Sequence, residues 1–331
     1  MYKDEKIAKI KDNDQISLIE NDIVDITDLE LTDAITKCIE NNDKAIELYE
    51  LYQFTKNYKY STIFGVDDFD KLEESIQRID EYEYEKHGIQ MYDKIKEPHK
   101  IIQDNIELIV FNKKFEAIHP QTQEELLLEY PIVVAIHRNE KLIEIRFDAI
   151  KQYFILEKRQ QMVYADIVDE VCEYIKENWN VELKILDMDF IIEMSKKSDI
   201  DNIKLISQYM NLSNGGKAQL AVGNNEEYIL PFIGELKSIM SDYKEEFEKN
   251  SVIKEALEQF IFEKEETTEY PWIEMLFLNE IKTRNIHVKF IFDYMNKGYC
   301  LILHYYNDAL IGMERMNHVT RFISESVKNE S

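Results

Sequence analysis

The stretch "NIHVKFIFDYMNKGYCLILHYY", residues 285–306, decides the fold class of this chain. Its first half alternates apolar and polar side chains, and the apolar set is Ile286, Val288, Phe290 and Phe292. Such alternation is typical of a strand with one buried face. Asn296-Lys297-Gly298 supplies turn residues before the second apolar run. The pattern predicts an antiparallel β-hairpin.

Residues 105–150 show the same period. "NIELIVFNKKFEAIHP" and "YPIVVAIHRNEKLIEIRFDAI" read as strands, with a short turn at Arg138-Asn139-Glu140. After that turn, the apolar residues at 143, 145 and 147 share one face of the predicted strand. Glu144 and Arg146 lie on the opposite, polar face.

The glycine-rich stretch "NLSNGGKAQLAVGNN", residues 211–225, raises the question of a phosphate-binding loop. A P-loop requires Gly-x-x-x-x-Gly-Lys-Ser/Thr, but Ala218 occupies the hydroxyl position and no glycine precedes Gly216 at the required spacing. Asn214-Gly215 is instead a strong signal for a two-residue hairpin turn. We therefore expect a hairpin here, not a nucleotide site.

Helical periodicity fills much of the remaining sequence. Residues 30–100 are predicted to be mainly helical, with one acidic helix over 67–88 that ends at Gly88. Amphipathic helices are also expected over 165–180, 232–250, 251–262 and 310–327. The first has a buried stripe of Ile167, Val171, Tyr174, Ile175 and Trp179, and the last turns Met313, Met316, Val319 and Ile323 inward. The fold class is therefore α+β, with a helical N-terminal region followed by antiparallel hairpins interleaved with amphipathic helices. We expect an acidic helical region over 1–100 and an α+β region over 101–331, and a further division near 200 stays open.

Charge limits the classes of partner. The 331 residues include 66 acids and 40 bases, a net charge of −26, which divides as −11, −8 and −7 over residues 1–100, 101–200 and 201–331. The resulting field repels nucleic-acid phosphates and anionic membranes, so direct binding to either is disfavoured. An acidic mimic of nucleic acid remains an alternative, although the excess charge is not gathered in one segment.

The expected compartment is the cytoplasm. No apolar run approaches the roughly 20 residues that cross a bilayer, and the N-terminal stretch is too polar for a secretory signal. Cys38, Cys172 and Cys300 are isolated, so neither a disulfide framework nor a zinc site is indicated.

Glu182-x-Lys184 is the strongest catalytic candidate, because metal-dependent nucleases use this spacing on a strand. Two-residue separation puts both side chains on one face, where the carboxylate can bind Mg²⁺ and the ammonium can assist the attacking water. Such a site needs an upstream aspartate on a neighbouring strand, and Asp148 is the best candidate. The competing interpretation is the polar face of a half-buried strand.

Two other groups of polar residues are weaker candidates. His287-x-Lys289 with Asp293 resembles a phospholipase D motif, but three residues rather than four separate the lysine from the aspartate. Arg315, His318 and Arg321 form a basic stripe on the last predicted helix, a candidate anion site. Only two residues separate Arg315 from His318, which is too few for the Arg–His motif of HEPN ribonucleases. The stripe also suits the negative C-terminal end of a helix.

These observations lead to three hypotheses about function. The leading one is a non-enzymatic intracellular subunit, adaptor or regulator that binds another protein or itself and needs no cofactor or metal. The second is a metal-dependent nuclease that uses Glu182 and Lys184, and the third is the acidic mimic.

Overall fold

The chain divides into two compact units, Met1–Lys56 with Tyr82–Gln90, and Asn57–Glu81 with Met91–Ser331. The computed structural model describes residues 29–41, 43–83, 91–103, 106–155, 159–195, 202–212, 215–221, 233–279, 285–306 and 313–330. The predicted boundary at residue 100 stays a prediction, and a further division near residue 200 stays open.

The first unit contains two described helices, α3 (Leu31–Asn41) and α4 (Asp43–Thr55). Phe54 of α4 packs edge-to-face on Tyr82, with ring centroids 5.3 Å apart. The Tyr82 hydroxyl donates a hydrogen bond to the Glu50 carboxylate. The helical prediction is confirmed for the residues of α3 and α4.

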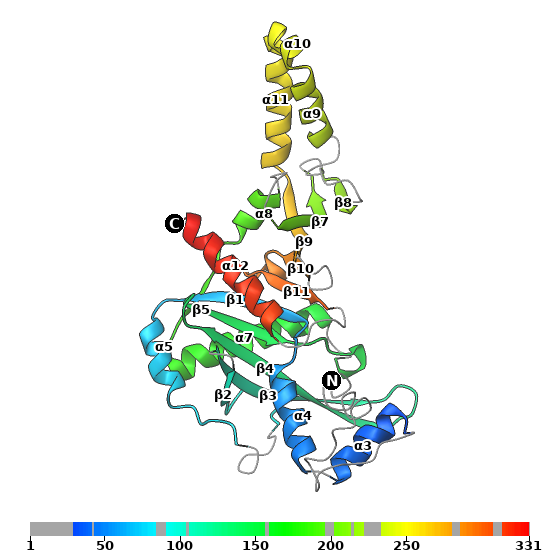
Figure 1. The fold of residues 1–331 in the computed structure, drawn as a ribbon, viewed down its shortest axis with the longest axis vertical. Coiled ribbons are helices and arrows are strands. Elements are labelled where there is room, and N and C mark those ends of the chain that lie inside the picture. Colours follow the sequence, from blue (N-terminus) through cyan, green and yellow to red (C-terminus); the bar gives the residue numbers. More distant parts are fainter. Residues whose placement is uncertain are drawn as a thin grey trace, which may run out of the picture. The chain divides into compact units, whose positions relative to one another are not determined.

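The second unit is built on one antiparallel sheet (Figure 1). In the described residues the sheet has eleven strands in the order β2-β3-β4-β5-β1-β11-β10-β9-β7-β8, and β6 pairs with β1. The strands are β1 (Tyr60–Val66), β2 (His99–Gln103), β3 (Ile106–Ile118), β4 (Glu125–His137), β5 (Leu142–Phe147), β6 (Leu183–Ile185), β7 (Ile203–Asn211), β8 (Lys217–Ala221), β9 (Glu269–Phe277), β10 (Ile286–Ile291) and β11 (Leu301–Tyr305). Together with the helices that cover it, this sheet confirms the α+β class.

The hairpins predicted from alternation are present. β10 pairs with β11, so that Val288 lies opposite His304, and β3, β4 and β5 form a continuous meander. The β4–β5 turn contains Lys141 at φ +58°. Short turns of this kind fix the strand register that the alternation requires.

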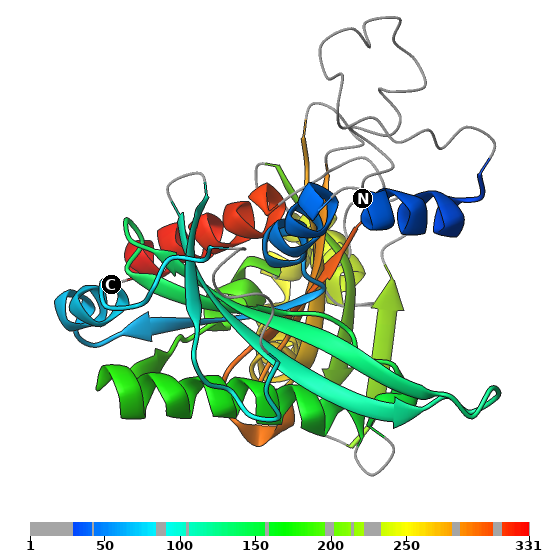
Figure 2. The same cartoon turned by 90° about the horizontal axis from the view of Figure 1, so that it is seen from below.

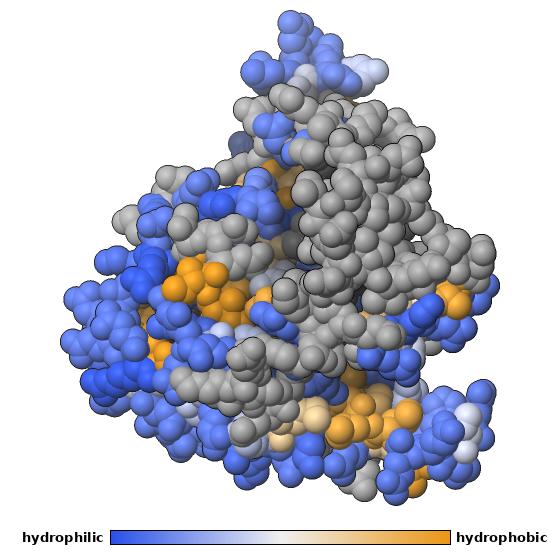
Figure 3. All heavy atoms as spheres, turned by 60° about the horizontal axis from the view of Figure 1, so that its bottom comes forward, coloured by the Kyte–Doolittle hydropathy of each residue, from blue (hydrophilic) through white to orange (hydrophobic). Residues whose placement is uncertain are grey.

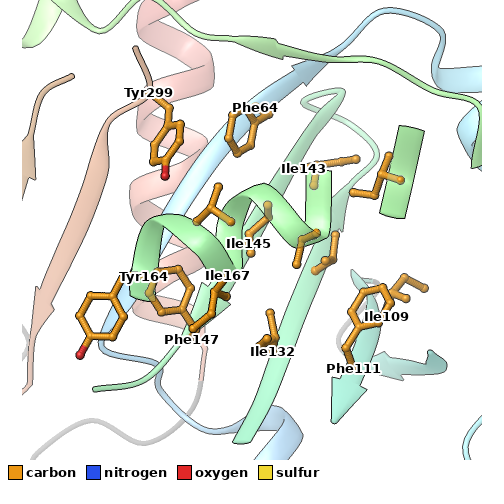
Figure 4. Close-up of a cluster of buried hydrophobic side chains, with 14 of the residues drawn as sticks. Phe64, Ile109, Phe111, Ile132, Ile143, Ile145, Phe147, Tyr164, Ile167 and Tyr299 are labelled. Carbon is orange, nitrogen blue, oxygen red and sulfur yellow. The ribbon is translucent and has the colours of Figure 1, made fainter. Parts of the chain in front are cut away.

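Helix α7 (Gln160–Tyr174) covers one face of the sheet and continues into a π-helical turn (Ile175–Trp179). Four residues of its predicted apolar stripe are buried, namely Ile167, Val171, Ile175 and Trp179. Figure 4 shows Tyr164 and Ile167 packed beside Ile145 and Phe147 of β5 in this core.

Helix α12 (Glu314–Glu330) covers the opposite face, so the sheet lies between α7 and α12 (Figure 2). The inward residues predicted for this helix are all buried, namely Met313, Met316, Val319 and Ile323. A second apolar core lies here and includes Ile63, Phe290 and Ile302 from the sheet.

β1 and β9 are the main differences from the sequence prediction, because neither segment was predicted to be a strand. β1 lies within residues 30–100, which were predicted to be mainly helical, and it pairs with β5 and β11 in the middle of the sheet. Residues 61–65 of β1 are all buried, because both faces of the sheet are covered. A strand buried on both faces has no polar–apolar alternation to reveal it.

The remaining helices are short or lie outside the sheet. Asp68 caps α5 (Phe69–Ile76) through a 3.1 Å hydrogen bond from the Lys71 amide. This helix is shorter than the one predicted over 67–88, and Gly88 lies outside the described residues. The others are α8 (Asp189–Ser195), α9 (Ile233–Asp242), α10 (Lys244–Lys249), α11 (Ser251–Glu266) and two 3-10 turns (Gln152–Phe154 and Tyr294–Asn296).

The glycine-rich stretch is a hairpin, as predicted. β7 pairs with β8, and Asn211 lies opposite Lys217. The Leu212 amide donates to the Gly216 carbonyl at 2.8 Å, and the Gly215 amide donates to the Leu212 carbonyl at 2.9 Å. These bonds close the hairpin, with Gly215 left-handed at φ +81°. Glycine takes this conformation without the strain that a side chain would add. Asn214, the other residue of the predicted turn, lies outside the described residues.

Candidate functional site

A network of buried charged groups lies between β4, β5 and α12. Glu144 Oε2 accepts hydrogen bonds from Arg146 Nη2 at 2.5 Å and from Thr320 Oγ1 at 2.7 Å. It also lies 3.1 Å from His137 Nε2. Neither Glu144 nor Arg146 has measurable exposure, because α12 covers the strand face that the sequence marked only as polar.

Helix α12 supplies further contacts to this network. Arg146 Nη2 donates to Asn317 Oδ1 at 2.6 Å, and Nη1 lies 3.0 Å from Met313 Sδ. Burial alone would raise the pKa of Glu144, but Arg146 and His137 outweigh it and hold the pKa well below its ordinary value. A buried ion pair of this kind is costly to break, because the remaining charge has no compensation.

His304 of β11 lies on the same face as this network. Its Nε2 is 2.9 Å from Ser61 Oγ on the neighbouring strand β1. Burial lowers the pKa of His304 from 6.5 to about 4, so the imidazole is neutral at physiological pH. The network and His304 are both closed to solvent, and we assign them to stability.

The predicted basic stripe does not form one surface. Arg315 is buried and donates from Nη2 to the Asn285 carbonyl at 2.5 Å. Its Nε and Nη1 have no acceptor in the described parts of the chain. His318 is exposed and contacts the Phe277 ring edge-to-face, and Arg321 pairs with Glu314 at 2.6 Å. The three residues therefore have three separate environments.

The predicted nuclease residues are not brought together. Glu182 directly precedes β6, which pairs with the Val66 end of β1. Asp148 follows β5 at the Tyr60 end, where it accepts a hydrogen bond from the Lys59 amide at 3.1 Å. The seven-residue strand β1 separates the two carboxylates by roughly 20 Å, which is too far for one metal ion.

Glu182 and Lys184 themselves lie at the surface. Both are exposed, and Glu182 pairs with Lys176 at 3.3 Å. This geometry matches the alternative interpretation, the polar face of a strand. Across the described residues, no group of three or more His, Cys, Asp or Glu side chains is arranged to hold a metal ion.

A polar cluster around Glu274 was missed in the sequence. Glu274 of β9 lies 3.2 Å from Lys289 Nζ and 3.4 Å from His287 Nε2, and it accepts a hydrogen bond from the Tyr305 hydroxyl at 3.1 Å. Lys289 also lies over the Trp272 ring, 3.2 Å from its centroid. His287 and Lys289 therefore pair with Glu274, while Asp293 Oδ1 accepts a hydrogen bond from the Gly298 amide at 2.7 Å.

This cluster ties three strands together on the sheet face opposite α12. His287 stacks on Tyr305 with ring centroids 4.1 Å apart. Burial lowers the pKa of His287, although Glu274 opposes this effect. The pKa of Tyr305 is raised to about 12, first by burial and then by Glu274. Neither the neutral imidazole nor the protonated phenol has the pKa of an activated nucleophile, so we assign the cluster to strand cohesion.

Residues 233–266, which we call the arm, carry the most exposed apolar surface. α9 and α11 run side by side and α10 joins them (Figure 1). Among the described residues, fourteen large apolar side chains are exposed, and six belong to the arm: Ile239, Tyr243, Val252, Ile253, Phe260 and Phe262. In the view of Figure 3 the described surface is mostly hydrophilic, and its apolar residues form separate patches.

A groove of about 430 Å³ lies between the three helices of the arm. Its apolar lining comes from Met240, Phe247, Ile261 and Phe262. Its charged lining consists of Lys237, Lys244 and Lys254 with one acid, Glu258. An apolar floor with a mainly basic rim is unusual in a chain with a net charge of −26, and it suits an apolar ligand with carboxylates at its margin.

Comparison with known proteins adds no identity. No protein-family model, no curated protein and no solved structure matches this chain. Within the described residues, no helix is both long and apolar enough to cross a bilayer.

Proposed function

We propose that this chain is a non-enzymatic cytoplasmic subunit, adaptor or regulator that acts through protein contacts made by the arm. The observation that carries the proposal is the concentration of exposed apolar side chains there, six of fourteen within 34 residues. Val252 is 74% exposed and Phe262 is 60% exposed. Exposed apolar clusters of this kind mark protein interaction sites more often than isolated apolar residues do.

The nuclease hypothesis receives less support from the geometry. Asp148 and Glu182 lie at opposite ends of β1, so the arrangement offers no shared metal site. Interaction through helices also needs no cofactor, and it uses surface that the fold leaves uncovered.

The test compares three forms of the full-length chain. Tagged wild type, the Val252→Glu/Phe260→Glu variant and the Leu127→Glu variant are used to purify bound proteins from the native host, and each bound protein is quantified. Leu127 is a matched control, because it is 55% exposed and lies on β4, outside the arm. A partner, including another copy of the chain, should be retained by wild type and the control but lost from the arm variant. Equal recovery of every bound protein by all three forms would contradict the proposal.

A further inference from the structure

The arm has a second apolar surface besides its groove. Val252, Ile253, Ala256 and Phe260 follow the helical spacing that places them on one side of α11, and we call this set the stripe. Val252, Ile253 and Phe260 are 74%, 49% and 47% exposed.

The stripe and the groove lie on opposite sides of the same helix. At 100° per residue, the groove residues Lys254, Glu258, Ile261 and Phe262 are centred roughly 170° from the stripe. The stripe is therefore outside the groove of its own arm, and both surfaces are exposed at once.

The charges that border the two surfaces are complementary. Glu255 and Glu263 are exposed and lie along one margin of the stripe. Lys264 Nζ lies 5.6 Å from the centroid of the Phe260 ring at the end of the stripe, so two acids and one base border it. The groove has three lysines and one glutamate in its lining. Two of these lysines are only loosely paired within the arm, Lys244 with Glu248 at 4.0 Å and Lys254 with Glu258 at 3.8 Å.

The geometry points to head-to-tail self-association, in which the stripe of one copy enters the groove of the next. This inference rests on the proposed function and names its partner as a second copy of this chain. Apolar side chains of the stripe meet the floor of Met240, Phe247 and Ile261, while Glu255 and Glu263 meet the lysine rim. The alternative, stripe against stripe, brings the acidic margins of two copies together, and like charges at close range oppose association.

Head-to-tail contact has a specific consequence for assembly. Each copy offers one stripe and one groove, so every contact leaves a free stripe at one end and a free groove at the other. Heterologous contacts of this kind close into rings or grow as open chains. The wild type should therefore show a mass that rises with protein concentration beyond that of a dimer.

Two variants separate the halves of the contact. Val252→Glu/Phe260→Glu blocks the stripe, and Lys244→Glu/Phe262→Glu blocks the groove. All four positions are well exposed, since the Lys244 side chain is 73% exposed, so the fold should tolerate the changes. Leu127→Glu serves again as the matched control.

The test is light scattering on size-exclusion fractions of the full-length chain. We expect wild type and Leu127→Glu to associate, and each blocked variant alone to be a monomer. An equimolar mixture of the two blocked variants should form a discrete dimer of twice the chain mass and nothing larger, because one intact groove and one intact stripe remain. Circular dichroism of each variant confirms that it is folded.

Three outcomes would overturn the inference. A monomeric wild type would do so, as would a mixture that stays monomeric, or a groove-blocked variant that associates like wild type. The proposed function fails on a different result, namely equal capture of every partner by wild type and arm variant. A monomeric wild type that still loses a partner in the arm variant would therefore reject self-association and leave the proposed function standing.

Discussion

Protonation of His304 should make the stability of the sheet unit depend on pH. Burial lowers the pKa of this histidine from 6.5 to about 4, and its Nε2 lies 2.9 Å from the Ser61 hydroxyl. Between pH 6.5 and 4 the unfolded chain binds a proton at this position that the folded chain does not. The free energy of unfolding therefore falls as the pH drops through this window, and the stability is fully present above pH 6.5.

The size of the effect follows from the two pKa values. A pKa lowered from 6.5 to about 4 corresponds to about 3 kcal/mol of unfolding free energy lost by pH 4, at about 1.4 kcal/mol for each pH unit. The measurement is urea denaturation at pH 7 and at pH 4.5, followed by tryptophan fluorescence. The two tryptophans of the chain, Trp179 and Trp272, both lie in the sheet unit, so the signal reports the unfolding of that unit.

The His304→Gln variant isolates the contribution of this residue. It keeps a hydrogen-bonding side chain opposite Ser61 but removes the titration, so its loss of stability on acidification should be smaller than that of wild type by about 2–3 kcal/mol. His119→Gln, at the β3–β4 turn, is the control and should behave like wild type. Glu144 acts in a lower window, because its depressed pKa gives stability that is present above the unfolded value of about 4.3 and lost below it. Equal pH dependence in wild type and His304→Gln would refute the reasoning.

Four further predictions concern the buried pair, the hairpin, the nuclease residues and the salt dependence of association. Glu144→Gln should lower the free energy of unfolding by about 3–5 kcal/mol in urea titrations, because Arg146 would stay buried without its counter-charge. Gly215→Val should cost about 1–2 kcal/mol through strain at φ +81°, since no atom lies within 4 Å of the added Cβ, and a nucleotide that raised the melting temperature would contradict the hairpin assignment. The isolated chain should not cleave DNA or RNA with Mg²⁺ or Mn²⁺, and activity lost in both Glu182→Ala and Lys184→Ala would overturn this expectation. Association should persist across a salt series and resist added duplex DNA; a partner displaced by DNA and lost by moderate salt would favour the acidic mimic.

Local patterns in the sequence predicted the elements whose polar and apolar residues alternate with a regular period. The alternation in residues 285–306 specified β10 and β11, and the stripes of α7 and α12 were identified residue by residue. β9 carried the same signal in Ile273, Met275 and Phe277, which are buried on one face, so this strand could have been found. Its residue Glu274 would then have indicated the partner of His287 and Lys289.

Features that depend on strand order could not be predicted in this way. β1 comes before β5 in the chain but lies between β5 and β11 in the sheet, and no local period encodes that position. Asp148 and Glu182 lie near opposite ends of β1, so the position of this strand also keeps the two carboxylates apart. The buried Glu144–Arg146 pair depends on α12, which lies some 170 residues further along the chain, so sequence spacing alone could not distinguish a solvated face from a covered one.

The polar groups of the sheet unit and the apolar surface of the arm differ in what they can still bind, and this difference favours association as the first activity to test. A catalytic site needs polar groups that meet a cavity and retain free donors or acceptors for substrate. In the described residues, Glu144 and Glu274 already bind neighbouring cations, and Glu182 and Arg321 form surface ion pairs. Glu144 Oε1 and Arg315 Nη1 have no partner there, but both atoms are closed to solvent. The arm has the opposite character, because its groove is lined by apolar side chains and loosely paired lysines and its stripe is open to solvent. Apolar area of this kind gains free energy only when another molecule covers it, so mutations in the arm should alter association before they alter the stability of the sheet.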